Sequence, residues 1–183
     1  MKTIRLLILL SLTIGFLGCK DDAKADSTNQ YIDAGTSTFY LIRHAEKDRS
    51  NVDNLDPELS QKGLGRAMHW AEILSEVPID VIYATDFQRT AMTAAPTSVK
   101  KDVDVIYYDP SSFDINQFKS DNLNKSVLVV GHSNTTPELT NQLLGVDKYY
   151  ELDDSDNGSL FIVQITNGVA TSQKLNFNCN CPD

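Results

Sequence analysis

The sequence predicts a single α/β domain built around a largely buried sheet. From Thr36 onward, short runs of apolar and β-branched residues alternate with longer segments of helical periodicity, which is typical of an α/β domain. The chain has 183 residues, which is enough for one sizeable core but too few for two ordinary domains. Its composition, 41% hydrophobic and 22% charged, is that of a folded globular protein.

The N-terminal residues are expected to be a targeting signal and not part of this fold. Lys2 and Arg5 precede an almost wholly apolar run over residues 6–17, and Gly18-Cys19 follows at once. The run is shorter than the roughly 20 residues that a membrane-spanning helix needs, so it predicts a secretory signal peptide.

The residues around Cys19 resemble a bacterial lipobox, in which the cysteine becomes the lipidated first residue of the mature protein. Phe16 departs from the leucine that is usual there, and the alternative is an ordinary signal peptide that happens to contain a cysteine. The lipobox interpretation predicts a protein of the bacterial cell envelope that is anchored to the membrane through Cys19.

The chain therefore divides into three segments. We expect residues 1–18 to be the lipoprotein signal peptide, residues 19–35 the lipidated cysteine with a flexible tether, and residues 36–183 the folded domain. The tether is rich in Asp, Ser, Thr and Ala, and it has too little apolar surface to offset the entropy lost on ordering it.

The folded domain contains six runs with the length and composition of strands. They are rich in β-branched and aromatic residues, as buried strands are. The runs lie at residues 39–42, 81–83, 103–107, 127–130, 159–165 and 169–175. Asn167-Gly168 separates the last two, which predicts a hairpin near the end of the chain.

Three helices are expected between these strands. Ser60 can cap the first, whose apolar residues recur at a spacing of roughly 3.6. Asp86 can cap the second, which we expect to stop near Pro96. The third is expected to begin at Ser133 or Asn134, directly after the most apolar strand.

Three short motifs stand close to the ends of predicted strands. Arg43-His44 follows the first strand, Arg89 lies in the first turn of the second helix, and His132 follows the fourth strand. Binding residues of an α/β sheet gather at the carboxyl ends of its strands. Each side chain alone could be an ordinary packing or surface residue, but together they predict a site for an anion.

The order and spacing of these motifs resemble the histidine phosphatase superfamily, whose relatives include the phosphoglycerate mutases and small phosphohistidine phosphatases. The matching residues are Arg43-His44, Asp56-Pro57-Glu58-Leu59-Ser60-Gln61-Lys62-Gly63, Arg89-Thr90-Ala91 with Thr93-Ala94, and Gly131-His132-Ser133. The resemblance implies a three-layer α/β/α sandwich with a mostly parallel central sheet. It also implies that residues 36–183 form a catalytic domain.

The resemblance implies a phosphoryl-transfer chemistry for these residues. A phosphomonoester is close to a dianion at neutral pH, so a nucleophile must reach phosphorus through an anionic shell. Arg43 and Arg89 would bind the phosphate oxygens, because a planar guanidinium group matches phosphate geometry. His44 would attack phosphorus to form a phosphohistidine, and His132 would donate a hydrogen bond to the group in transfer. This scheme requires no metal and no other cofactor.

The proton donor for the leaving group is not evident from the sequence. Many family members carry a Leu-x-Glu pattern after the second arginine, and it is missing here. Asp109 is the preferred candidate because it follows a predicted strand, but Asp109-Pro110 is also an ordinary turn pair.

Other polar residues and the remaining cysteines have roles that the sequence leaves open. Ser133 could bind phosphate or simply cap the following helix. Glu46 is expected to be a structural acid that holds Arg43 or a loop amide, because a carboxylate beside phosphate would repel it. Cys179 and Cys181 could pair in an oxidising envelope or could each remain free.

These observations favour one function over three others. The main expectation is a lipid-anchored, monomeric phosphomonoester hydrolase that acts on a phosphorylated small molecule or a phosphoprotein. A phosphoglycerate mutase-like phosphotransferase fits less well, because the chain between Arg89 and His132 leaves little room for a substrate-enclosing insertion. A non-catalytic phosphate-binding or interaction module would keep the arginines without needing His44. Nucleic-acid binding is disfavoured by the net charge of -9, with 25 acidic against 16 basic residues.

Overall fold

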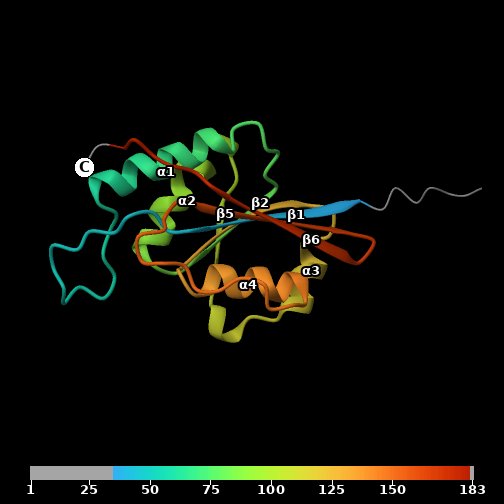
Figure 1. The fold of residues 1–183 in the computed structure, drawn as a ribbon. Coiled ribbons are helices and arrows are strands. Elements are labelled where there is room, and N and C mark those ends of the chain that lie inside the picture. The colour runs from blue at the N-terminus through green and yellow to red at the C-terminus, as the bar shows by residue number, and fades with distance from the viewer. Residues whose placement is uncertain (1–34, 182–183) are drawn as a thin grey trace, which may run out of the picture. The chain divides into compact units, whose positions relative to one another are not determined.

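A computed structural model describes residues 35–181 of the chain (Figure 1). The predicted signal peptide and almost all of the predicted tether, including Cys19, lie outside the described residues. The strands are β1 (Thr36–Arg43), β2 (Val81–Thr85), β3 (Val105–Tyr108), β4 (Ser126–Gly131), β5 (Ser159–Thr166) and β6 (Val169–Asn176). The helices are α1 (Gln61–Ile73), α2 (Gln88–Lys101), the single-turn η1 (Pro110–Ser112), α3 (Ile115–Asp121) and α4 (Thr135–Leu144).

The six strands form one sheet in the order β3-β2-β4-β1-β5-β6. Strands β3, β2, β4 and β1 pair in parallel, whereas β5 and β6 pair antiparallel at one edge. The expectation of an α/β fold with a mostly parallel sheet is confirmed. The register places Arg43 at the end of β1 opposite Gly131 at the end of β4. Because these strands are parallel, the residues that follow them, His44 and His132, leave the sheet at the same edge.

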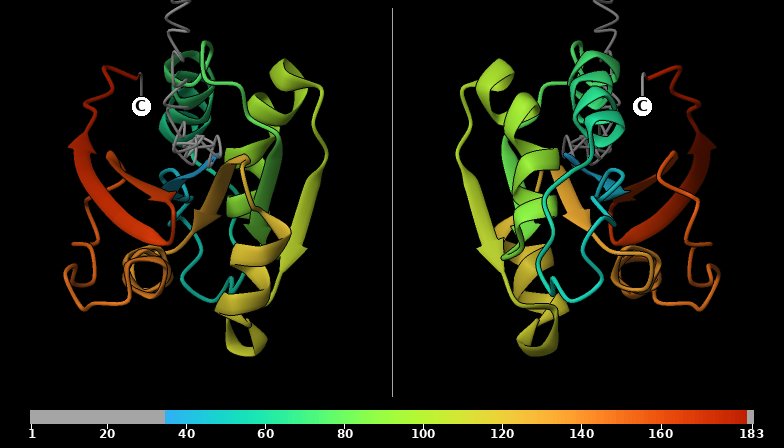
Figure 2. Two further views of the ribbon diagram at one scale, coloured as in Figure 1. Left: turned by 90° about the vertical axis from the view of Figure 1, so that its right-hand side faces the viewer. Right: turned by 90° about the vertical axis from the view of Figure 1, so that its left-hand side faces the viewer.

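Helices cover both faces of the sheet, as Figures 1 and 2 show: α1 and α2 lie on one face, and α3 and α4 lie on the other. The side chains of β1 alternate between two apolar clusters. Phe39 pairs with Phe118 of α3 in one cluster, while Ile42 joins Trp70 of α1 in the other. Both faces of the sheet are therefore buried, and this produces the three-layer sandwich.

The start and end of α2 differ from the prediction. Asp86 is exposed and does not cap the helix, because Phe87 occupies the capping position and has no side-chain cap hydrogen bond. Instead, the carboxylate of Asp56, in a preceding loop, accepts a hydrogen bond of 2.9 Å from the Gln88 amide. The helix also continues through Pro96 to Lys101. Its buried face packs on the sheet, and such tertiary packing outweighs the local cost of one proline.

The other predicted boundaries agree more closely with the structure. Ser60 caps α1 by accepting a hydrogen bond of 3.1 Å from the Gly63 amide. Asn167 and Gly168 form the hairpin turn, both with positive φ, as a tight two-residue turn requires. The short helix α3 has no counterpart among the predicted elements. None of the helices in residues 35–181 has the length and apolar character needed to cross a membrane.

Candidate active site

The two histidines of the predicted site meet at the carboxyl edge of the sheet. The ring centroids of His44 and His132 lie 5.4 Å apart, with the rings in an edge-on arrangement. Arg43 and Arg89 are close enough to both rings to lower their pKa values. The structure therefore brings together the four residues that the motifs singled out, from β1, β4 and α2.

The hydrogen bond of the His44 side chain determines its tautomer. Nδ1 lies 2.7 Å from the carbonyl oxygen of Ala45, and a carbonyl can only accept. Nδ1 therefore carries the proton, and Nε2 keeps its lone pair. Burial is the main factor that lowers the His44 pKa to about 3, and the nearby charges of Arg43, His132 and Arg89 lower it further. At neutral pH this ring is uncharged, with a lone pair on Nε2.

The backbone of His44 is held on both sides. Its amide donates a hydrogen bond of 2.9 Å to the Gly131 carbonyl, and its carbonyl accepts one of 2.9 Å from Nδ2 of Asn157. The next amide, of Ala45, donates to Oγ1 of Thr93 at 2.9 Å. These hydrogen bonds fix the backbone on both sides of the His44 ring, which limits the motions that would displace it.

A chain of hydroxyl groups orients His132. Its Nε2 lies 2.8 Å from Oγ1 of Thr85, which donates its own proton to Oγ1 of Thr90 at 3.2 Å. Thr90 in turn donates to the Thr85 carbonyl at 2.6 Å. Because the hydroxyl proton of Thr85 is donated to Thr90, Thr85 accepts in its bond with His132, and Nε2 of His132 is the donor. Nδ1 is therefore unprotonated in the neutral ring. Burial, followed by Arg89 and Arg43, lowers the His132 pKa to about 4.

Each arginine has a buried Nε donor without a hydrogen-bond partner among the described residues. Arg43 is 4% exposed, and its Nη1 donates to the carbonyls of Asp153 and Asp154 at 2.9 and 3.0 Å. Nη1 of Arg89 lies 3.3 Å from the Asp56 carboxylate, and its guanidinium group lies over the Phe87 ring. The Nε atoms of both arginines are buried and have no hydrogen-bond partner within the described part of the chain. A buried donor without a partner is costly, so both atoms are candidate donors to an anion.

Asp109 lies apart from the histidine pair. It is exposed at the start of η1, where Oδ1 accepts hydrogen bonds of 2.8 Å from the amide and hydroxyl of Ser111. These bonds lower the pKa of its carboxyl, whereas a proton donor needs a raised pKa. Asp109 does line a cleft of about 360 Å³ with Thr85, the partner of His132. Of the two roles that the sequence left open for Asp109, these contacts favour the turn over the acid.

We expect Asp109→Asn to leave turnover of both aryl and alkyl phosphates within about threefold of wild type, because its carboxylate serves the turn. Initial rates with one substrate of each kind measure this. A loss near 100-fold that is confined to the alkyl phosphate, whose leaving group needs a proton, would instead identify Asp109 as the acid.

Two polar residues have partners that the sequence did not suggest. Ser133 donates to the Glu151 carboxylate at 3.1 Å and does not cap α4, so the expectation of a helix cap is wrong. Glu46 is a structural acid as expected, but its partner is Arg66 and not Arg43. Phosphate binding by Ser133 remains a prediction.

Several residues that support the site escaped the sequence analysis. Thr85, Asp154 and Asn157 hold a histidine or Arg43, although they lie up to 113 residues away in the sequence. Nothing in their local sequence distinguishes them from ordinary loop or helix residues. Asp56 was recognised only as part of a family-like segment, and its bond to Arg89 depends on how the loop folds back.

Comparison with known proteins finds similarity to one protein family. Residues 39–110 match the model of the histidine phosphatase superfamily (branch 1). Phosphoserine phosphatase 1 of Hydrogenobacter thermophilus is 38% identical over 73 residues, which are 38% of this chain and 35% of the relative. The 2,3-bisphosphoglycerate-dependent phosphoglycerate mutase of Chlamydia abortus is 30% identical over 117 residues, 59% of this chain and 51% of the relative. The chain thus spans about half or less of the length of these curated relatives.

A solved structure agrees with this assignment at the level of the fold. The alpha-ribazole phosphatase from Shigella flexneri superposes with a TM-score of 0.61 at 16% identity, covering 76% of this chain and 96% of that structure. Residues 39–110 are therefore similar in sequence to the histidine phosphatase superfamily, and the solved structure shows that the domain has the same fold.

The lowered pKa values of the two histidines predict that the fold loses stability in acid. Each ring stays neutral in the folded protein to about pH 4, but it is protonated below about pH 6.5 when the chain is unfolded. The unfolded state then binds more protons, so stability falls as the pH is lowered through this window. For each histidine, the free energy of unfolding should fall by about 2 kcal/mol as the pH is lowered from about 6 to about 4.5.

Urea unfolding at several pH values tests this expectation. His44→Gln and His132→Gln should each flatten the dependence of the unfolding free energy on pH. Equal pH dependence in wild type and both variants would contradict the burial of neutral rings.

Proposed function

We propose that this protein is a phosphomonoester hydrolase that works through a phosphohistidine on His44. The observation that carries this proposal is the state of His44: its Nδ1 proton is held by a carbonyl, and its Nε2 lone pair is free beside two guanidinium groups. The relatives named as phosphatases support the proposal.

The proposed reaction begins with binding of the phosphate dianion. The unpartnered Nε atoms of Arg43 and Arg89 donate to its oxygens and offset its charge. Nε2 of His44 then forms a bond to phosphorus as the bond from phosphorus to the ester oxygen breaks, and the leaving oxygen takes up a proton from water. Water attacks the phosphohistidine in a second step, which releases inorganic phosphate and restores His44.

His132 contributes to this reaction from Nδ1. In the neutral ring only Nε2 carries a proton, and Thr85 accepts it, so Nδ1 can donate only after the ring gains a second proton. A bound dianion raises the pKa of His132 by favouring its cation. When substrate binds, His132 therefore takes up a proton from solvent. The resulting cation can donate from Nδ1 and stabilise the charge on the transferring group.

The positive charges of Arg43 and Arg89 supply electrostatic stabilisation that a divalent metal supplies in other phosphoryl transfers, and we propose that the reaction is independent of metal. Release of inorganic phosphate from a panel of aryl and alkyl phosphates, with and without EDTA, tests both statements. We expect turnover that EDTA does not change. Binding of phosphate without release of product would overturn the hydrolase proposal in favour of a phosphate-binding module. Transfer of the phosphoryl group to a second hydroxyl in place of water would favour a phosphotransferase.

Trapping of the intermediate tests the nucleophile directly. Brief reaction with labelled substrate, followed by a quench without acid, should leave an acid-labile phosphoryl group on the protein. Label on a serine or an aspartate would contradict attack by His44.

We also propose that the protein is anchored to the bacterial cell envelope by a lipid on Cys19. The support is the basic start, the apolar run and the Gly18-Cys19 pair of the sequence. Palmitate labelling that disappears in Cys19→Ala would support the anchor. Equal labelling of both proteins, or none in either, would overturn it.

A further inference from the structure

The guanidinium group of Arg43 binds a carboxylate in addition to its backbone partners. Nη1 lies 2.9, 3.0 and 3.4 Å from the carbonyl oxygens of Asp153, Asp154 and Asp156. Nη2 donates to Oδ1 of Asp154 at 3.0 Å. Because Nη1 is committed to the backbone, Nε and Nη2 are the adjacent nitrogens with which Arg43 can bind an anion. Two adjacent N–H groups of this kind can hold a phosphate through two of its oxygens.

The carboxylate of Asp154 competes for these nitrogens. Nε of Arg43 has no hydrogen-bond partner among residues 35–181, whereas Nη2 faces the carboxylate. Hydrogen bonds from Arg49 and Arg43 lower the pKa of Asp154, so this group is ionised at neutral pH. A phosphate that binds at Nε would lie beside that negative charge on the same guanidinium group. The two anions repel each other, so Asp154 opposes the binding of phosphate.

A second arginine gives Asp154 another partner. Oδ2 of Asp154 lies 2.7 Å from Nη2 of Arg49, so the carboxylate bridges the two arginines. The side chains of Asp154 and Arg49 are 69% and 57% exposed, whereas that of Arg43 is buried. The carboxylate can therefore leave the buried arginine and stay paired with the exposed one.

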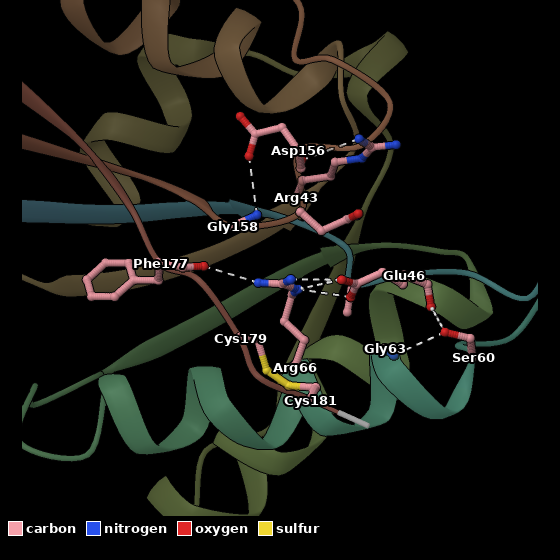
Figure 3. A network of polar contacts seen from close by, with 12 residues as sticks. Arg43, Glu46, Ser60, Gly63, Arg66, Asp156, Gly158, Phe177, Cys179 and Cys181 are labelled. Atoms are coloured by element: carbon pink, nitrogen blue, oxygen red, sulfur yellow. Dashed lines mark hydrogen bonds and ion pairs between the residues drawn. A yellow bond between two sulfur atoms is a disulfide. The ribbon is translucent and has the colours of Figure 1, made fainter. Parts of the chain in front are cut away.

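A cleft of about 660 Å³ leaves room for this movement. Arg49 and Asp154 line it beside His44, and so does Cys179, which forms a disulfide with Cys181 (Figure 3). The side chain of Asp154 can therefore turn into open space without displacing a packed neighbour.

The backbone around Asp154 is held by other bonds. Asp156 accepts a hydrogen bond of 3.2 Å from the Gly158 amide (Figure 3), and Asn157 donates one of 2.9 Å to the His44 carbonyl. The carbonyl groups that bind Nη1 therefore keep their place when the side chain of Asp154 rotates. This rotation alone is sufficient to release Nη2.

We propose that Asp154 is a resident anion of the phosphate site, which an incoming phosphate displaces from Arg43 and which then stays paired with Arg49. The inference rests on the proposed function, because it assumes that the phosphate binds at Arg43. It adds a regulation of that site. The carboxylate matches the buried charge of Arg43 in the free protein, and it returns to Arg43 as inorganic phosphate leaves. Asp154 thus weakens the binding of the product.

Calorimetric titration with inorganic phosphate tests the proposal without turnover. Asp154→Asn should bind phosphate about threefold to fivefold more tightly than wild type, because the competing charge of an exposed ion pair is lost. A residue that only held Arg43 in place would give the opposite result, which is weaker binding. Asp153→Asn is the matched control, since this carboxylate lies within electrostatic reach of Arg43 but bonds to Ser155. Its phosphate affinity should stay within about 1.5-fold of wild type.

A double-mutant cycle tests the part of Arg49. Arg49→Gln should weaken phosphate binding about threefold, because the displaced carboxylate loses its second partner. In Asp154→Asn the same substitution should change the affinity by less than about 1.5-fold, since no carboxylate remains to be received. Equal weakening in both backgrounds would show that Arg49 binds the phosphate directly, and it would overturn the displacement onto Arg49.

The outcomes separate this inference from the hydrolase proposal. Unchanged or weaker phosphate binding by Asp154→Asn would overturn the resident anion, even if wild type hydrolyses phosphate esters. An equal gain in Asp153→Asn would also overturn it, because the gain would then reflect overall charge. Tighter binding by Asp154→Asn alone, in a protein that hydrolyses no ester, would support the resident anion and overturn the hydrolase. Failure of wild type and every variant to bind phosphate would overturn both.

Discussion

His44→Ala is expected to lower kcat/KM for a chromogenic aryl phosphate by about 10⁴-fold or more, because removal of a covalent nucleophile leaves only binding and electrostatic stabilisation. The ring is buried, neutral and aligned by its bond to the Ala45 carbonyl, and alanine provides none of these properties. Nε2 of His132 cannot take over the attack, because it is engaged with Thr85. The loss should appear in kcat, and initial rates at saturating substrate measure it.

Two further variants make this result specific. His44→Gln retains a side-chain amide that can donate to the Ala45 carbonyl, so it should be as inactive as His44→Ala while keeping more of the fold's stability. His69→Ala removes a histidine on α1 and should keep wild-type rates. Turnover within about tenfold of wild type in His44→Gln would rule out the phosphohistidine route.

Arg89→Lys is expected to lower kcat/KM by about 10²- to 10³-fold, as loss of one preorganised donor does in other transition states. The substitution keeps the positive charge, so the loss isolates the geometry of the guanidinium group. The substitution removes the Nε donor of Arg89. The ammonium group of lysine cannot donate from the position of Nε and also reach Asp56.

Chemical rescue distinguishes this role from a structural one. Methylguanidinium added to Arg89→Ala should restore part of the activity, since the ion can occupy the vacated space and donate to the phosphate. Asp56→Asn should cost only about threefold to tenfold, because the amide oxygen can still accept from Gln88. If Arg89→Lys retained the wild-type rate, the guanidinium geometry would have no part in the reaction.

The fold was predictable to the extent that local sequence decides it. The apolar runs correctly located all six strands, and Ser60 and Asn167-Gly168 marked a helix start and a turn through bonds and dihedral angles that depend on nearby residues. The start of α2 was mispredicted because its cap comes from Asp56, thirty-two residues earlier. The predicted end of α2 near Pro96 was wrong for a similar reason. Packing on the sheet, which local sequence does not show, decides whether a helix continues through a proline.

The candidate site shows the same division. Arg43, His44, Arg89 and His132 could be singled out because each lies near the end of a strand, where an α/β sheet gathers its binding residues. The residues that determine the protonation of the two histidines could not be identified from the sequence. Thr85 reaches His132 only because β2 lies beside β4, which its position in the sequence does not reveal.

By itself, the sequence determined which residues can carry the chemistry, because side-chain type and strand-end position are local properties. Only the tertiary structure decided the tautomer of His44, the hydroxyl chain behind His132, the partner of Glu46 and the carboxylate that Asp154 places on Arg43. Each of these arises from groups that are distant along the chain and adjacent in space. Proton positions and local charge depend on that adjacency, since hydrogen bonds and desolvation act over a few ångströms.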